Sequence, residues 1–226
     1  MNIRYALPAA LLVHLMCLSS SPAKDYTFQP EGKPADSFLI KSGEKLLTID
    51  KDGLLTFRGD SGGTFGIFNP DNAELLTSAS EVEIEFRTEG QVTFGIFLRA
   101  QNEGGDSYMA FFGTGLNDSL TFNLCKTAFV VVQEPGKATM AQKRISDYRP
   151  GVWYKLRLRL RNEESGPVAF SADLTESGTT NTILELNAED SQSPVTSPGL
   201  IGLRFVANKS GGGGVFQIKN ISVSPN

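Results

Sequence analysis

The stretch that most constrains the fold runs from Gly151 to Arg161 and reads GVWYKLRLRLR. With a period of two, one face carries Val152, Tyr154, Leu156, Leu158 and Leu160, and the other carries Trp153, Lys155, Arg157, Arg159 and Arg161. No helix gives that division. The stretch predicts a long strand that is buried on one face and strongly cationic on the other.

A second stretch carries the complementary charge on the same period. Residues 81–87 read EVEIEFR, with Val82, Ile84 and Phe86 on one face and Glu81, Glu83, Glu85 and Arg87 on the other. Like charges two residues apart on a strand lie about 6.7 Å from each other, and each such pair costs about 0.6 kcal/mol in water. Placing the acidic strand beside the basic one relieves both repulsions. We therefore predict that the two strands belong to one sheet, with their charged faces on the same side.

The predicted ligand surface lies on a third strand, Val92 to Ala100. One of its faces carries Thr93, Gly95, Phe97 and Arg99, and Tyr108 lies at the start of the next strand. Gly95 lowers the surface, which either admits a ligand or marks a β-bulge. An aromatic surface with a few polar groups is typical of a ligand site. The predicted binding residues are therefore Thr93, Phe97, Arg99 and Tyr108, together with Trp153.

Trp153 is the only tryptophan and lies on the polar face of its strand. It either stacks on a sugar ring or covers the end of the molecule as a packed aromatic residue.

The rest of the chain repeats the strand pattern. Short apolar runs at Leu46 to Ile49 and Leu54 to Phe57 flank a turn that contains Gly53, which predicts a hairpin. Near the C-terminus, one extra residue at Lys219 or Asn220 restores a broken alternation, which predicts a β-bulge. About a dozen short strands without a convincing helix predict an all-β fold, a two-sheet antiparallel jelly-roll sandwich.

The first residues have the layout of a secretory signal. Arg4 precedes an apolar run from Ala6 to Leu18, and small residues follow up to Ala23. The run of about 13 residues is too short for a membrane span, which needs about 20. We predict cleavage after Ala23, a single jelly-roll domain over residues 24–226, and a periplasmic or extracellular location. Lipid attachment at Cys17 is the alternative.

Several function classes are excluded by composition. His14, the only histidine, and one of the two cysteines, Cys17, lie in the predicted signal, which leaves Cys125. The mature chain therefore lacks the residues for a His and Cys zinc site or for a Ser-His-Asp or Cys-His catalytic centre, although residues 59–63 read GDSGG. A net charge of −4 argues against nucleic acid as a partner.

The succession of EVEIEFR, GIFLRA, GVWYKLRLRL, GLIGLRF and FQIKNISV resembles secreted bacterial jelly rolls of the concanavalin A-like lectin and laminin G-like superfamily. It is similar to the branch that includes 3-keto-disaccharide hydrolase domains. In that branch, the strand after G-I-F-x-R tends to carry a glutamate, whereas this chain has Tyr108, Met109 and Ala110. EVEIEFR also resembles the E-x-D-x-E segment of family 16 glucanases, with Glu83 in place of the central Asp.

We therefore expect a carbohydrate-binding module without catalysis of its own, whose partner is a glycan or polysaccharide. One alternative is a glycoside hydrolase or lyase that acts through Glu83, Glu85 or Asp173 on a 3-keto-sugar. Another is a laminin G-like protein-interaction domain. No cofactor or metal is predicted, and the sequence leaves calcium open.

Overall fold

The computed structural model describes residues 23–34, 38–59, 62–68, 79–100, 105–114, 120–128, 139–163, 166–207 and 213–225. The regular structure in these ranges consists of strands and 3₁₀ turns, which include Glu44–Leu46. No helix within these ranges has the length and apolar composition needed to cross a membrane.

The first sheet has eight strands, and every neighbouring pair is antiparallel. Seven strands follow one another across it in the order β13 (Thr182–Asp190), β12 (Val168–Glu176), β11 (Tyr154–Asn162), β6 (Ala79–Gly90), β15 (Gly214–Pro225), β4 (Leu55–Gly59) and β3 (Leu47–Ile49). The eighth, β1 (Lys24–Thr27), pairs with the C-terminal half of β15, while β4 pairs with its N-terminal half.

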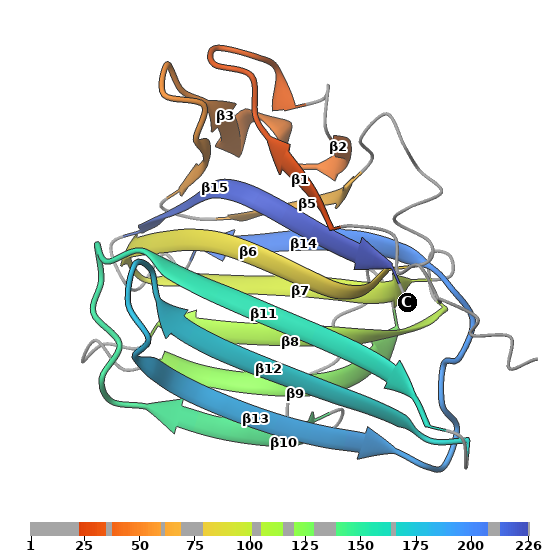
Figure 1. Ribbon diagram of the computed structural model, residues 1–226. Helices are drawn as coiled ribbons and strands as arrows, with labels where there is room; N and C mark the ends of the chain where they lie inside the picture. Colours follow the sequence, from red (N-terminus) through yellow and green to blue (C-terminus); the bar gives the residue numbers. More distant parts are fainter. Residues whose placement is uncertain are drawn as a thin grey trace, which may run out of the picture.

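The second sheet has seven antiparallel strands. Their order is β10 (Thr139–Ile145), β9 (Leu120–Ala128), β8 (Asp106–Thr114), β7 (Val92–Ala100), β14 (Leu200–Ala207), β5 (Gly62–Phe68) and β2 (Phe38–Ser42). Figure 1 shows the two sheets as stacked layers, with β15 beside β6. The two-sheet sandwich that the strand pattern predicted is confirmed.

The predicted pairing of the charged strands is also confirmed. β11 lies between β6 and β12, and its register sets Arg157 opposite Glu83 and Lys155 opposite Glu85. The register of β15 shifts between Ile218 and Asn220, which is the predicted bulge.

The predicted hairpin is formed by β3 and β4. In its turn, the Asp50 carboxylate accepts hydrogen bonds from the backbone N–H groups of Asp52 and Leu54, at 2.9 and 3.0 Å. Gly53 has a φ of 73°, a conformation that suits glycine.

The core lies between the sheets and is rich in aromatic rings. Phe86 and Phe216 of the first sheet stack at a centroid distance of 5.1 Å, and Phe216 lies 4.1 Å from Phe94 of the second sheet. Ile84, Phe86, Leu156 and Leu158, which the alternation assigns to the buried faces of their strands, are 0% exposed, and so are Phe94 and Ile96 of β7. The alternation of each strand therefore assigns one face to the core and leaves the other face for function.

Candidate functional site

The predicted ligand strand is β7, which lies in the seven-stranded sheet. Its alternation places Thr93, Gly95 and Phe97 on the outer face of that sheet. Thr93 is half-buried, and Phe97 is 0% exposed. Phe97 belongs to a small buried apolar cluster whose other members are Ala100, Met109 and Cys125. It therefore contributes to an apolar floor and presents no open ring to a ligand.

Four strands each place one outward residue in a single row across this sheet. The register sets Arg204 of β14 opposite Gly95 of β7, Gly95 opposite Phe111 of β8, and Phe111 opposite Asn123 of β9. Neighbouring strands lie about 4.8 Å apart, so the Cα atoms of Arg204 and Asn123 are separated by about 14 Å. We call these four residues the sheet-face row.

Arg204 carries the positive charge of the row. Its side chain is half-buried, and its Nη1 is buried without a hydrogen-bond partner in the described part of the chain. Burial lowers the pKa of Arg204 below its ordinary value, although a guanidinium stays protonated in proteins. Leaving a buried polar group unsatisfied costs about 1–3 kcal/mol, and more for a charged group. Burying the Arg204 Nη1 donor therefore costs folding free energy unless a group outside the protein accepts its hydrogen bond.

Asn123 carries the second unsatisfied group of the row, and the register continues beyond it to Gln142 of β10. It is 4% exposed, and its Oδ1 is buried without a hydrogen-bond partner among the described residues. An acceptor at Asn123 and a donor at Arg204 thus lie at the two ends of the row.

The middle of the row is apolar and narrow. A Cβ atom built on Gly95 would come within 3.2 Å of the Met109 sulfur and 3.7 Å of the Phe111 ring. Gly95 pairs regularly with both neighbouring strands, so it marks no bulge. Phe111 is half-buried, and its ring borders the space over Gly95.

Arg99 does not lie on this face. It has a φ of 54° at a shift in register between β7 and β14, and it is 5% exposed. This bulge reverses the alternation, so Ala100 joins the outer apolar cluster in its place. The Arg99 guanidinium donates to Asn162 Oδ1 at 2.7 Å and to the Val195 carbonyl at 2.8 Å.

Tyr108 also lies off the predicted face, because its partner on β7 is the core residue Leu98. Its hydroxyl donates to Asp190 Oδ2 and accepts from the Val195 N–H, both at 3.0 Å. Burial, followed by the contacts with Asp190, raises the pKa of Tyr108 to about 12 despite the Val195 N–H and the nearby Arg99. Arg99 and Tyr108 thus hold the segment after β13 against the end of the sandwich.

Asp190 is the negatively charged residue at this end of the sandwich. The Lys126 ammonium lies 2.9 Å from its Oδ2, and the Gln192 and Ser193 N–H groups donate to its Oδ1 at 3.3 and 3.2 Å. Burial alone would raise the pKa of Asp190, but Lys126, the Ser193 N–H and the Tyr108 hydroxyl together lower it. The described partners satisfy this carboxylate within the protein, which is typical of a structural role.

The three candidate catalytic carboxylates lie on the outer face of the eight-stranded sheet, each beside a cation. Glu83 accepts from Arg157 at 2.8 and 3.1 Å, and Asp173 accepts from Arg159 at 2.6 Å. Glu85 lies 3.5 Å from the Lys219 ammonium. Arg159 also pairs with Glu81 at 2.8 Å, so the charges alternate across the strands. This ladder is the arrangement expected of a charge-paired sheet face.

Trp153 is half-buried just before β11, on the side opposite the sheet-face row. The Arg87 guanidinium lies over its ring, 4.9 Å from the centroid. Arg87 in turn donates to Gln217 Oε1 at 2.6 Å. The structure therefore does not bring Trp153 together with Thr93 and Phe97.

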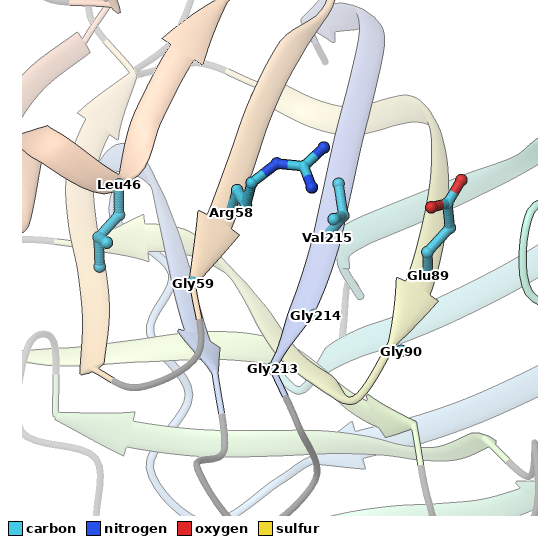
Figure 2. Close-up of a pocket in the computed structure, with 8 residues that line it drawn as sticks. All are labelled: Leu46, Arg58, Gly59, Glu89, Gly90, Gly213, Gly214 and Val215. Atoms are coloured by element: carbon cyan, nitrogen blue, oxygen red, sulfur yellow. The ribbon is translucent and has the colours of Figure 1, made fainter.

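A groove of about 570 Å³ lies at one end of the eight-stranded sheet (Figure 2). It is lined by Leu46, Arg58, Gly59, Glu89, Gly90, Gly213, Gly214 and Val215. Arg58 and Glu89 flank Val215 in the register, and both are exposed. The described lining contains no aromatic side chain, so the groove lacks the stacking surface that a sugar ring prefers.

No protein-family model and no curated protein matches the chain. Solved structures do match the chain. A legume lectin-like domain from Entamoeba histolytica is 11% identical, with a TM-score of 0.57 over 87% of this chain and 94% of that chain. A prokaryotic β-1,3-1,4-glucanase (lichenase) from a mouse hindgut metagenome is 9% identical, with a TM-score of 0.58 over 90% and 99%.

Peanut lectin is 8% identical, with a TM-score of 0.57 over 91% of this chain and 98% of that chain. At these identities, the likeness is one of fold. The chain therefore has the two-sheet jelly-roll fold of these structures, which is the fold that the resemblance implied. Its resemblance to the 3-keto-disaccharide hydrolase branch stays a prediction.

Three residues of the row, Arg204, Phe111 and Asn123, were not predicted as site residues. Each lies on a different strand, and only the register brings them beside Gly95. The alternation of apolar and polar residues could have assigned each of them to an outer face. It could not have placed them in one row, because it contains no information on the register between strands.

Proposed function

We propose that the protein is an exported carbohydrate-binding jelly roll without catalysis of its own, and that its glycan binds on the outer face of the seven-stranded sheet. The observation that carries this proposal is the sheet-face row. It sets an unsatisfied donor at Arg204 and an unsatisfied acceptor at Asn123 on either side of an apolar, aromatic centre. Sugars need this combination, because their hydroxyl groups form hydrogen bonds and their C–H faces pack on rings.

The ion pairs of the other sheet support a role without catalysis. A glycosidase needs two carboxyl groups that face one scissile bond, one of them able to deliver a proton. Glu83 and Asp173 instead accept short hydrogen bonds from Arg157 and Arg159. The names of the fold neighbours, two lectins and a glucanase, agree with a glycan ligand.

The test is a panel of polysaccharides and 3-keto-disaccharides, assayed for both retention and product release. We expect retention of at least one glycan and no release. Phe111→Ala should weaken binding by about two- to tenfold, since an aromatic contact contributes about 0.5–1.5 kcal/mol beyond its buried area. Asn123→Ala should weaken it similarly.

Asn187→Ala is the matched control for Asn123→Ala, because Asn187 is exposed on β13 of the opposite sheet. It should leave binding unchanged. Product release that disappears in Glu83→Gln or Glu85→Gln would replace the proposal with a glycoside hydrolase. Failure to retain any glycan would favour a protein-interaction domain.

A further inference from the structure

We infer that the sheet-face row selects glycans that carry a carboxylate, that is, polysaccharides that contain uronic acid residues. This inference rests on the proposed function and names the ligand class of the same site.

The charge distribution on the outer face of the seven-stranded sheet is the first argument. The described outward residues of its four adjacent strands are Thr93, Gly95 and Phe97 on β7, Ser107, Met109, Phe111 and Gly113 on β8, Thr121, Asn123, Cys125 and Thr127 on β9, and Gly202, Arg204 and Val206 on β14. Among these positions, Arg204 is the one charged residue. These four strands therefore present one cation and no carboxylate, and the exposed Arg144 of the neighbouring strand β10, opposite Thr121, is a second cation on the same face.

The contrast with the other sheet is the second argument. There, Arg157 lies 2.8 Å from Glu83, and Arg159 lies 2.6 Å from Asp173. The fold thus supplies carboxylate partners to arginines on an exposed face. It supplies none to Arg204, whose buried Nη1 has no hydrogen-bond partner in the described ranges.

The chemistry of the guanidinium is the third argument. It cannot lose its proton, and its planar fork matches the two oxygens of a carboxylate. A neutral sugar hydroxyl would satisfy one donor and leave the charge uncompensated. A carboxylate would satisfy two donors and the charge together, with hydrogen bonds about twice as strong as neutral ones.

The length of the row indicates a polymer or oligomer. The Cα atoms of Asn123 and Arg204 are about 14 Å apart, a separation that favours a ligand of more than one sugar unit. The chain of the ligand would run across the strands over Gly95 and Phe111. A neighbouring unit would then donate a hydroxyl to Asn123 Oδ1.

The experiment measures binding to polygalacturonate and alginate, each compared with its own carboxyl-reduced, neutral form. We expect the wild-type protein to bind at least one acidic form about ten- to a hundredfold more tightly than its neutral counterpart. Arg204→Gln should remove this preference. Arg204→Lys keeps the positive charge but loses the planar guanidinium. This variant should therefore retain only part of the preference for the acidic form.

Arg161→Gln is the matched control, since Arg161 is exposed on β11 of the other sheet. It should keep the preference. An equal loss in Arg161→Gln would show that general surface charge is responsible and would overturn the inference. Circular dichroism of each variant checks the fold, and the wild-type comparison alone is decisive where a variant does not fold.

The outcomes separate this inference from the proposed function. Equal binding of the wild-type protein to acidic and neutral forms would overturn carboxylate selection and leave glycan binding in place. Binding to neither form, and to no glycan of the wider panel, would overturn both. Retention of polyglutamate as tight as that of the polyuronates would assign the face to acidic polypeptides and would overturn the glycan ligand.

Discussion

Buried polar side chains in this sandwich are of two kinds. Tyr108 and Asp190 are satisfied by described protein groups that include the Val195 and Ser193 N–H groups. Arg204 and Asn123 each keep a buried atom without a partner among the described residues. Because unsatisfied buried groups are rare in folded proteins, the first kind indicates a structural role, and the second kind supports the ligand site proposed for the sheet-face row.

Asp190 gives a pH-dependent prediction at this scale. Its pKa is lowered in the folded protein, against an unfolded value of about 3.9. The unfolded chain therefore binds more protons than the folded protein as the pH falls below about 4. The stabilisation from Asp190 is fully present above that pH and is lost below it.

Asp190→Asn removes this titration. We expect the free energy of unfolding of the wild-type protein to fall more steeply between pH 5 and 3 than that of Asp190→Asn, measured by urea denaturation at each pH. Identical slopes would show that Asp190 has the same pKa in both states.

At the scale of the element, β11 shows how one strand serves two purposes. Leu156, Leu158 and Leu160 are 0% exposed and fill the core. The alternate residues Arg157 and Arg159 form ion pairs with β6 and β12. The apolar face fills the core, whereas the charged face forms ion pairs with the neighbouring strands.

Two adjacent residues of β11 separate these effects. Leu158→Ala should lower the free energy of unfolding by about 2–5 kcal/mol, because it leaves a cavity in a packed core. Arg157→Ala should lower it by no more than about 1 kcal/mol, since its side chain is 45% exposed and solvent screens the ion pair. Denaturant unfolding of both variants measures the difference. Similar losses would contradict the division of roles between the two faces.

At the scale of the whole molecule, the sandwich could be predicted from the sequence because alternation reveals a strand and its buried face locally. The pairing of β6 with β11 was also predictable, because it relieves the repulsion between like charges on each strand. The sheet-face row could not be predicted, because it depends on the register of four strands. The reversal at Arg99 was hidden as well, since a bulge with a positive φ leaves no mark in a run such as GIFLRA.

The N-terminal strand gives the last prediction. β1 begins at Lys24, the first residue expected after cleavage of the leader, and pairs with the half of β15 that β4 does not cover. Cleavage beyond Thr27 would remove β1 and leave these backbone groups of β15 unpaired at a sheet edge. Exported material should therefore begin at Lys24, which intact-mass analysis and N-terminal sequencing can establish.

Deleting residues 24–27 from the mature chain should lower its unfolding midpoint in denaturant. A mature protein that retains a lipid on Cys17, or a deletion without effect on the midpoint, would contradict this account of the N-terminus.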